Sequence, residues 1–141
     1  MDILIINGPN LNLLGNRETG IYGDLSFDDY MEEIVKAYPQ HNLSSYQSNI
    51  EGEIINRLQD ANLEVNAVVL NAGGYTHTSV AIADAIRSID IPVLEVHISN
   101  LLSREEYRHK SLIGSACMGT IMGFGLESYR LAIEFFTKRI F

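Results

Sequence analysis

The chain has 141 residues, 46% of them hydrophobic, and a formal net charge of -8. This length predicts one catalytic domain over residues 1–141, and the negative charge argues against nucleic acid or an anionic membrane as a partner. We expect neither a membrane span nor a signal peptide, because no apolar run approaches ~18 residues and the first residues show no basic region. A single cysteine, Cys117, excludes an internal disulfide, so a cytoplasmic setting is expected.

Apolar, β-branched runs alternate along the chain with segments of helical periodicity. The strands are predicted over 3–6, 43–47, 67–70, 93–97 and 118–122. The helices are predicted over 27–38, 51–62 and 128–139, with another that begins after Thr78 or Ser79 and reaches Ile89. Ser26 and Pro39 bound the first helix, whose apolar face comprises Phe27, Tyr30, Met31, Ile34, Val35 and Tyr38. This alternation implies right-handed crossovers and a parallel sheet covered on both faces.

The connection after the first strand, residues 7–23, is far longer than the 2–6 residues or so of an ordinary connection. It is rich in Asn and Gly and carries Arg17 five positions before Tyr22. Long loops of this kind are usually lids or binding loops. A nearby cation stabilises the ionised form of a tyrosine, so the pair has a specific chemical meaning.

Polar residues follow three of the predicted strands at their carboxyl ends. Asn7 ends the first strand, Asn71 ends the third, and Glu95, His97 and Ser99 run through the end of the fourth. Open parallel sheets bind ligands outside the carboxyl ends of their strands. The sequence therefore predicts a site at this edge of the sheet.

Two of these segments have more than one interpretation. Glu95 and His97 share one face of a strand, so the glutamate can accept the ring proton of the histidine and raise its basicity. The same residues are equally compatible with an ordinary strand end. Residues 71–79 offer backbone N–H groups to an anion at a helix start, or form only a strand–turn–cap unit.

A charge-dense run over residues 104–110 is typical of a solvated helix face, although Arg104 and Arg108, four apart, would share a face near the site. His77, His97 and Cys117 offer no close ligand pair such as H-x-x-x-H or C-x-x-C, so we predict no metal site.

Five blocks of sequence, in order, resemble type II 3-dehydroquinate dehydratase. They are N-G-P-N-L-N-L-L-G-N-R-E…Y-G at 7–23, S-N-x-E-G-E at 48–53, N-A-G-G-Y-T-H-T-S at 71–79, E-V-H-I-S-N at 95–100 and R-E-E-Y-R-H-K-S at 104–111. The chain departs from the family at Thr19, where proline is common. The resemblance implies a flavodoxin-like α/β fold with a five-stranded parallel sheet and helices on both faces. It also implies no metal, no organic cofactor and a homo-dodecamer of four trimers.

The activity that the resemblance implies is an anti elimination of water from 3-dehydroquinate, through an enolate, to give 3-dehydroshikimate. It assigns Tyr22 as the base and His97 as the general acid, and Arg17 supports the tyrosinate. Asn10 would hold a water at the enolate oxygen, and Glu95 would orient His97. The substrate-binding residues that it implies are Asn71, His77, Asp84 from a neighbouring subunit, Ile98, Ser99 and Arg108. A flavodoxin-like module that binds a flavin or nucleotide is the alternative; it explains the sheet edge but not the Arg17/Tyr22 pair.

Overall fold

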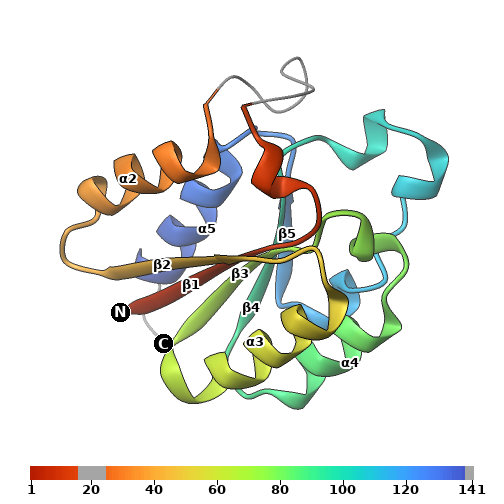
Figure 1. The fold of residues 1–141 in the computed structure, drawn as a ribbon, viewed down its shortest axis with the longest axis horizontal. Coiled ribbons are helices and arrows are strands. Elements are labelled where there is room, and N and C mark those ends of the chain that lie inside the picture. Colours follow the sequence, from red (N-terminus) through yellow and green to blue (C-terminus); the bar gives the residue numbers. More distant parts are fainter. Residues whose placement is uncertain (16–24, 139–141) are drawn as a thin grey trace.

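Five parallel strands form one sheet in the order β2-β1-β3-β4-β5 (Figure 1). The structure is a computed structural model that describes residues 1–15 and 25–138. The strands are β1 (Asp2–Asn7), β2 (Asn42–Gln47), β3 (Ala67–Asn71), β4 (Val93–His97) and β5 (Gly119–Met122). The α-helices within the described residues are α2 (Phe27–Ala37), α3 (Glu51–Glu64), α4 (Val80–Ser88) and α5 (Glu127–Lys138). This strand order is that of flavodoxin-like folds, so the predicted fold class is confirmed.

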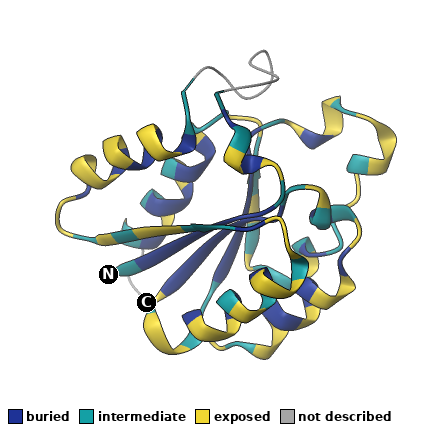
Figure 2. Cartoon of the chain, in the orientation of Figure 1, coloured by how far each residue is buried: buried dark blue, intermediate teal, exposed yellow. Residues whose placement is uncertain are grey.

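Helices cover both faces of the sheet, with α2 and α5 on one face and α3 and α4 on the other (Figure 1). Because successive side chains of a strand point to opposite faces, Ile3 and Ile5 of β1 pack against the first pair of helices. Leu4 and Ile6 pack against the second pair. Figure 2 shows the result, with buried central strands and exposed outer helix faces. None of the helices in the described residues combines the length and hydropathy of a membrane span.

The helix starts follow the capping chemistry that the sequence indicates. Ser26 accepts a hydrogen bond from the backbone N–H of Asp29 at 3.2 Å, and Ser79 accepts one from Ile82 at 2.9 Å. One detail of the first helix is wrong in the prediction. The spacing predicts Val35 on the apolar face of the helix. Its side chain is 42% exposed, because the buried face of the helix is narrower than the sequence pattern suggests.

The chain reverses direction across the sheet between β1 and β3. It leaves β1 for the edge strand β2 and returns to β3 on the other side of β1, which makes the carboxyl ends of β1 and β3 a topological switch point. The two loops that leave this point are packed tightly. The N–H of Gly8 donates to the carbonyl of Asn71 at 2.7 Å, and a Cβ at Gly8 would lie 2.3 Å from the carbonyl oxygen of Ala72. Only glycine permits this approach.

Candidate active site

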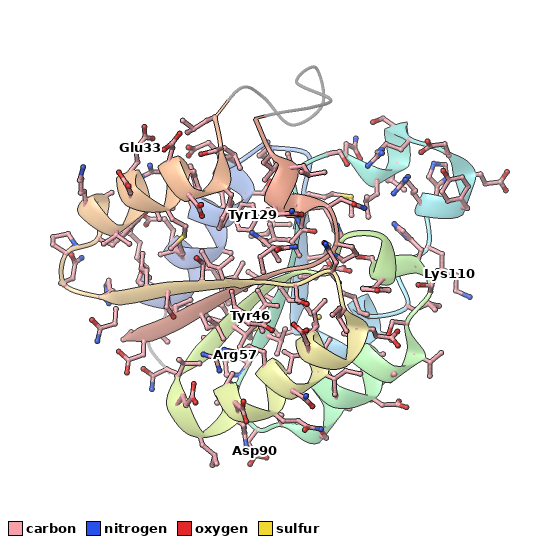
Figure 3. All side chains as sticks on the ribbon, viewed as in Figure 1. Glu33, Tyr46, Arg57, Asp90, Lys110 and Tyr129 are labelled. Carbon is pink, nitrogen blue, oxygen red and sulfur yellow. The ribbon has the colours of Figure 1, made fainter. Side chains whose placement is uncertain are left out.

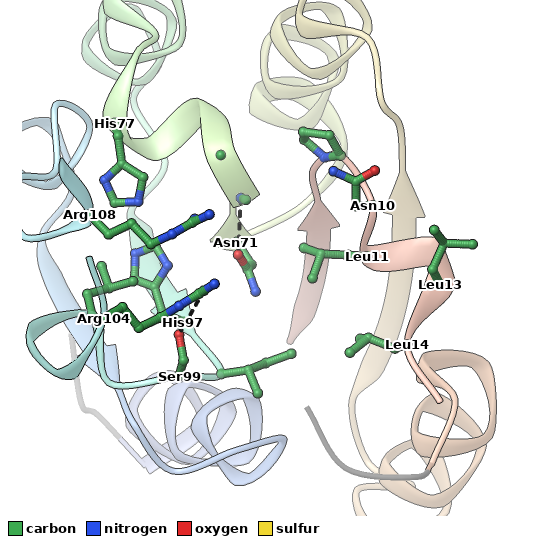
Figure 4. A pocket seen from close by; sticks show the side chains of 15 residues that line it. Asn10, Leu11, Leu13, Leu14, Asn71, His77, His97, Ser99, Arg104 and Arg108 are labelled. Carbon is green, nitrogen blue, oxygen red and sulfur yellow. Dashed lines mark hydrogen bonds between the residues drawn. The ribbon is translucent and has the colours of Figure 1, made fainter. Parts of the chain in front are cut away.

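A cavity of about 170 Å³ opens at the carboxyl ends of the strands, at the switch point and beside β4 (Figure 4). Figure 4 shows two unlike walls, with imidazole and guanidinium groups on one side and leucines from the loop after β1 on the other. This is the sheet edge at which the sequence predicts a site. The residues that line the cavity are Pro9, Asn10, Leu11, Leu13, Leu14, Asn71, Gly73, Gly74, His77, His97, Ile98, Ser99, Leu101, Arg104 and Arg108.

His97 lies against a buried carboxylate at the end of β4. Nε2 of His97 is 3.1 Å from Oε2 of Glu95, and both side chains are almost inaccessible to solvent. The carboxylate is held from two further sides. The Ser111 hydroxyl donates to Oε2 at 2.5 Å, and the Thr120 hydroxyl donates to Oε1 at 2.6 Å. A histidine supported in this way keeps a fixed orientation and has an anion beside it.

Glu95 is ionised despite its burial. Burial disfavours the charged form, but hydrogen bonding and attraction from His97, together with the two hydroxyl donors, outweigh it and hold the pKa of this carboxyl below its usual value. The same charge acts on Cys117. Burial, with the repulsion of Glu95 added, raises the pKa of the Cys117 thiol to about 12. The thiol is therefore protonated at neutral pH and unsuited to nucleophilic attack.

His77 presents a defined nitrogen to the cavity. Its Nδ1 lies 2.8 Å from the backbone carbonyl of Lys110, and a carbonyl only accepts hydrogen bonds. Nδ1 therefore carries the hydrogen, and Nε2 of the neutral ring is the acceptor. The turn from Gly73 to His77 that carries this residue is a short 3-10 helix leading into α4.

Two arginines give the cavity a local positive charge in a chain whose net charge is negative. The Arg108 guanidinium donates to Glu105 at 2.9 Å, and Arg104 donates to the Ser99 hydroxyl at 3.4 Å. The sequence predicts that Arg104 and Arg108 share one face of a helix. This is wrong, because residues 101–103 and 106–108 form two separate 3-10 turns. Both guanidinium groups still line the cavity, since the turns bring them to the same wall. Paired arginines of this kind suit a carboxylate.

Asn10 adopts a left-handed backbone conformation, with φ of 69°, and is the one non-glycine residue with positive φ among those that the structure describes. Asparagine tolerates this conformation better than most residues, and such strain often marks a functional site. The N–H of Asn10 donates to Oδ1 of Asn49 at 3.0 Å. Gln47 donates to the same oxygen at 3.1 Å, so the end of β2 holds the loop that carries Asn10.

Most of the candidate residues from the sequence meet at this cavity. Seven line it and Glu95 lies behind His97; the seven are Asn10, Asn71, His77, His97, Ile98, Ser99 and Arg108. Asp84 does not line the cavity of its own chain; its carboxylate is 70% exposed and 3.7 Å from Arg87. Arg17 and Tyr22 lie outside the described residues. No group of three or more His, Cys, Asp or Glu side chains arranged for a metal ion occurs in the part of the chain that the structure describes.

Sequence reasoning missed the residues that hold the site from behind. Asn49 and Ser111 lie within the blocks of sequence that resemble the family, so the resemblance marks their positions but assigns them no role. Thr120 carried a weaker signal. Thr120 sits on the edge strand β5, opposite Glu95 in the sheet register, and only the pairing of β4 with β5 brings it to the carboxylate.

The chain matches the family described as "Dehydroquinase class II" over residues 1–137. A 3-dehydroquinate dehydratase of Prochlorococcus marinus is 48% identical over 136 residues, which cover 95% of this chain and 94% of that protein. One of Campylobacter jejuni is 51% identical over 135 residues, which cover 94% of this chain and 85% of the other. The crystal structure of a type II dehydroquinase from Butyrivibrio crossotus superposes with a TM-score of 0.92 at 44% identity, covering 97% of each chain.

Proposed function

Because this chain belongs to the class II dehydroquinase family, we propose that it is a hydro-lyase that eliminates water from 3-dehydroquinate to give 3-dehydroshikimate. The observation that carries the proposal is the His97–Glu95 pair at a cavity that also holds two guanidinium groups. An acid next to anion-binding groups suits the loss of water from a small hydroxylated carboxylic acid. The alternative, a module that binds flavin or nucleotide, is not favoured, because the relatives are named as dehydratases.

The elimination requires a general acid, a general base and a group that stabilises negative charge. The proton to be removed lies next to a ketone, so a base and a group that stabilises the enolate are sufficient. We assign the base to Tyr22 and its activation to Arg17, both outside the described residues. A tyrosine with a pKa of about 10 is only ~0.1% ionised at neutral pH. Lowering the pKa by about two units would raise this fraction roughly a hundredfold, equivalent to ~2.7 kcal/mol.

His97 is the group that we assign to protonate the departing hydroxyl. Hydroxide is a poor leaving group, so the acid must deliver its proton as the C–O bond breaks. The buried carboxylate of Glu95, 3.1 Å away, favours the imidazolium that donates this proton. Because Ser111 donates to one oxygen of that carboxylate and Thr120 donates to the other, Glu95 is held in place beside His97.

The remaining groups bind and orient the substrate. We assign the carboxylate and hydroxyls of 3-dehydroquinate to the side chains of Asn71, His77 and Arg108 and to the backbone of Ile98 and Ser99. All five line the cavity. Asn10 would hold a water at the enolate oxygen, and its strained backbone is supported by Asn49.

The direct test is turnover of 3-dehydroquinate by the purified protein. The product is an enone, so its formation is followed as a rise in ultraviolet absorbance. We expect His97→Ala to abolish most of the activity. His41→Ala is the matched control, because His41 lies next to the N-terminal amine, away from the cavity. No turnover by the unaltered protein would refute the function.

We further propose that the working unit is a trimer, four of which form a dodecamer. Asp84 supports this, because its exposed carboxylate is absent from the lining of its own cavity and is available to a neighbouring site. Asp84→Ala should weaken substrate binding and leave the fold intact, whereas Asp90→Ala, an exposed control just beyond α4, should change neither. Light scattering coupled to activity measurements tests the assembly. A fully active isolated monomer would refute it.

We also infer a cytoplasmic location and one catalytic domain over residues 1–141. The support for the location is chemical: Cys117 is a free, half-buried thiol, and free thiols are typical of proteins in a reducing compartment. Fractionation of the native cells would test the location.

A further inference from the structure

Three polar side chains are buried where α5 meets the carboxyl ends of β1 and β3. Asn7, Asn71 and Tyr129 are respectively 1%, 4% and 0% exposed, and Figure 3 shows Tyr129 in the interior. Asn71 Nδ2 lies 2.9 Å from Tyr129 Oη, and that oxygen lies 2.7 Å from Oδ1 of Asn7. Burying such groups costs free energy unless they are hydrogen-bonded, so the three form one coupled unit.

The direction of every bond in this unit follows from one backbone amide. The N–H of Gly73 can only donate, and it points at the Asn71 side chain at 3.2 Å, so the atom that it meets is Oδ1 (dashed line in Figure 4). Nδ2 of Asn71 must then face Tyr129, whose oxygen accepts from it. The hydroxyl hydrogen of Tyr129 is left to donate to Asn7, which therefore presents its own oxygen.

This arrangement fixes what Asn71 offers to a ligand. An asparagine amide that is free to turn can present either an acceptor or a donor. Here the oxygen accepts from Gly73 and one hydrogen of Nδ2 is donated to Tyr129, so Nδ2 keeps a second hydrogen for an acceptor on a ligand. Asn71 lines the cavity, which places that donor within the proposed site.

We propose that Tyr129 is a positioning residue that, together with the Gly73 amide, holds the Asn71 side chain in one orientation, so that the site presents an N–H donor to an oxygen of the substrate. This inference rests on the proposed function and deepens it. It assigns the substrate atom next to Asn71 as a hydrogen-bond acceptor, whereas Nε2 of a neutral His77 ring pairs with a donor. A substrate hydroxyl satisfies either residue, and a carboxylate satisfies Asn71.

The hydroxyl of Tyr129 is removable without removing its ring. The ring packs against Phe27 and Tyr30, with centroids 5.1 and 6.2 Å away, and these contacts persist in Tyr129→Phe. Tyr30 provides a matched control. Its hydroxyl is also buried, but it makes no hydrogen bond within the described residues, so Tyr30→Phe removes an equivalent oxygen from the same cluster without touching Asn71.

Steady-state kinetics with 3-dehydroquinate test the proposal. We expect Tyr129→Phe to raise KM about tenfold and to change kcat less than about threefold, because the lost bond positions a binding group. Tyr30→Phe should match the unaltered protein. In an Asn71→Ala background, Tyr129→Phe should leave KM unchanged, because the group through which it acts is gone. An unchanged KM in the single variant, or the same rise in both backgrounds, would overturn the inference.

Neutron diffraction from crystals of the unaltered protein gives a second test, which needs neither a folded variant nor activity. We expect deuterons on the Asn71 atom that faces Tyr129 and none on the atom that faces the Gly73 amide. The reverse orientation would overturn the inference. Failure of the proposed function is distinguishable, because it would appear as absent turnover in the unaltered protein while the deuterons stay as expected.

Discussion

Replacing Glu95 by glutamine removes one buried negative charge from beside His97 and keeps the shape of the side chain. Two hydroxyl groups, from Ser111 and Thr120, donate to the carboxylate in the structure, and Nε2 of His97 lies 3.1 Å from it. The amide of glutamine has one oxygen and one NH₂ group. A hydroxyl can turn to accept from that NH₂, but a protonated imidazole cannot. We therefore expect Glu95→Gln to fold and to disfavour the acid form of His97.

The distance between His97 and Glu95 sets the size of this effect. At 3.1 Å and an effective dielectric constant of about 20, the attraction between unit charges is ~5 kcal/mol, an upper limit because the amide dipole and the surroundings recover part of it. Hydrogen bonds to charged groups exceed neutral ones by about 1 kcal/mol or somewhat more. A loss of about 1–2.5 kcal/mol corresponds to a fall in kcat of about 5- to 70-fold at neutral pH.

The assay is the dependence of kcat on pH, followed through the absorbance of the enone. Without the anion, the positive charge on His97 has no counter-charge beside it, so kcat should fall. Glu53→Gln is the matched control, because Glu53 also accepts two hydroxyl hydrogen bonds, from Tyr46 and Ser48, but lies outside the cavity. A Glu95→Gln enzyme with unchanged kcat and an unchanged profile would refute the role of this charge.

Four further outcomes are expected. Tyr22→Phe should keep the wild-type melting temperature and lower activity about 10²- to 10⁴-fold, the usual contribution of a general base. A near-normal kcat would contradict the assignment of Tyr22 as the base. His97→Ala should lower kcat far more than it raises KM, and a change in KM alone would make the histidine a binding residue. Gly8→Ala should cost at least about 2 kcal/mol in chemical denaturation, because the new Cβ meets the Ala72 carbonyl at 2.3 Å. Since the folded-state pKa of Glu95 is lowered, its stabilisation is present above the ordinary value of 4.5 and lost as the pH falls below it. The unfolding free energies of the wild type and Glu95→Gln should therefore converge on acidification, and a constant gap would contradict the shift.

The sequence by itself determined the elements and the edge at which the site lies. Strand and helix patterns repeat within two to four residues, so local spacing shows them directly. The same holds for the capping serines Ser26 and Ser79, whose partners are three residues away. Polar residues at the ends of three predicted strands then located the site, because the carboxyl ends of parallel strands meet at one edge.

Only the tertiary structure decided what surrounds each functional side chain. Glu95 accepts hydrogen bonds from hydroxyl groups 16 and 25 residues away, and the N–H of Asn10 donates to a residue 39 positions away. The amide of Asn71 donates to a tyrosine 58 positions along the chain. Contacts over such separations depend on which strands pair and which helix covers them. Local periodicity carries no information about them, because they are fixed only when the sheet and its covering helices pack together.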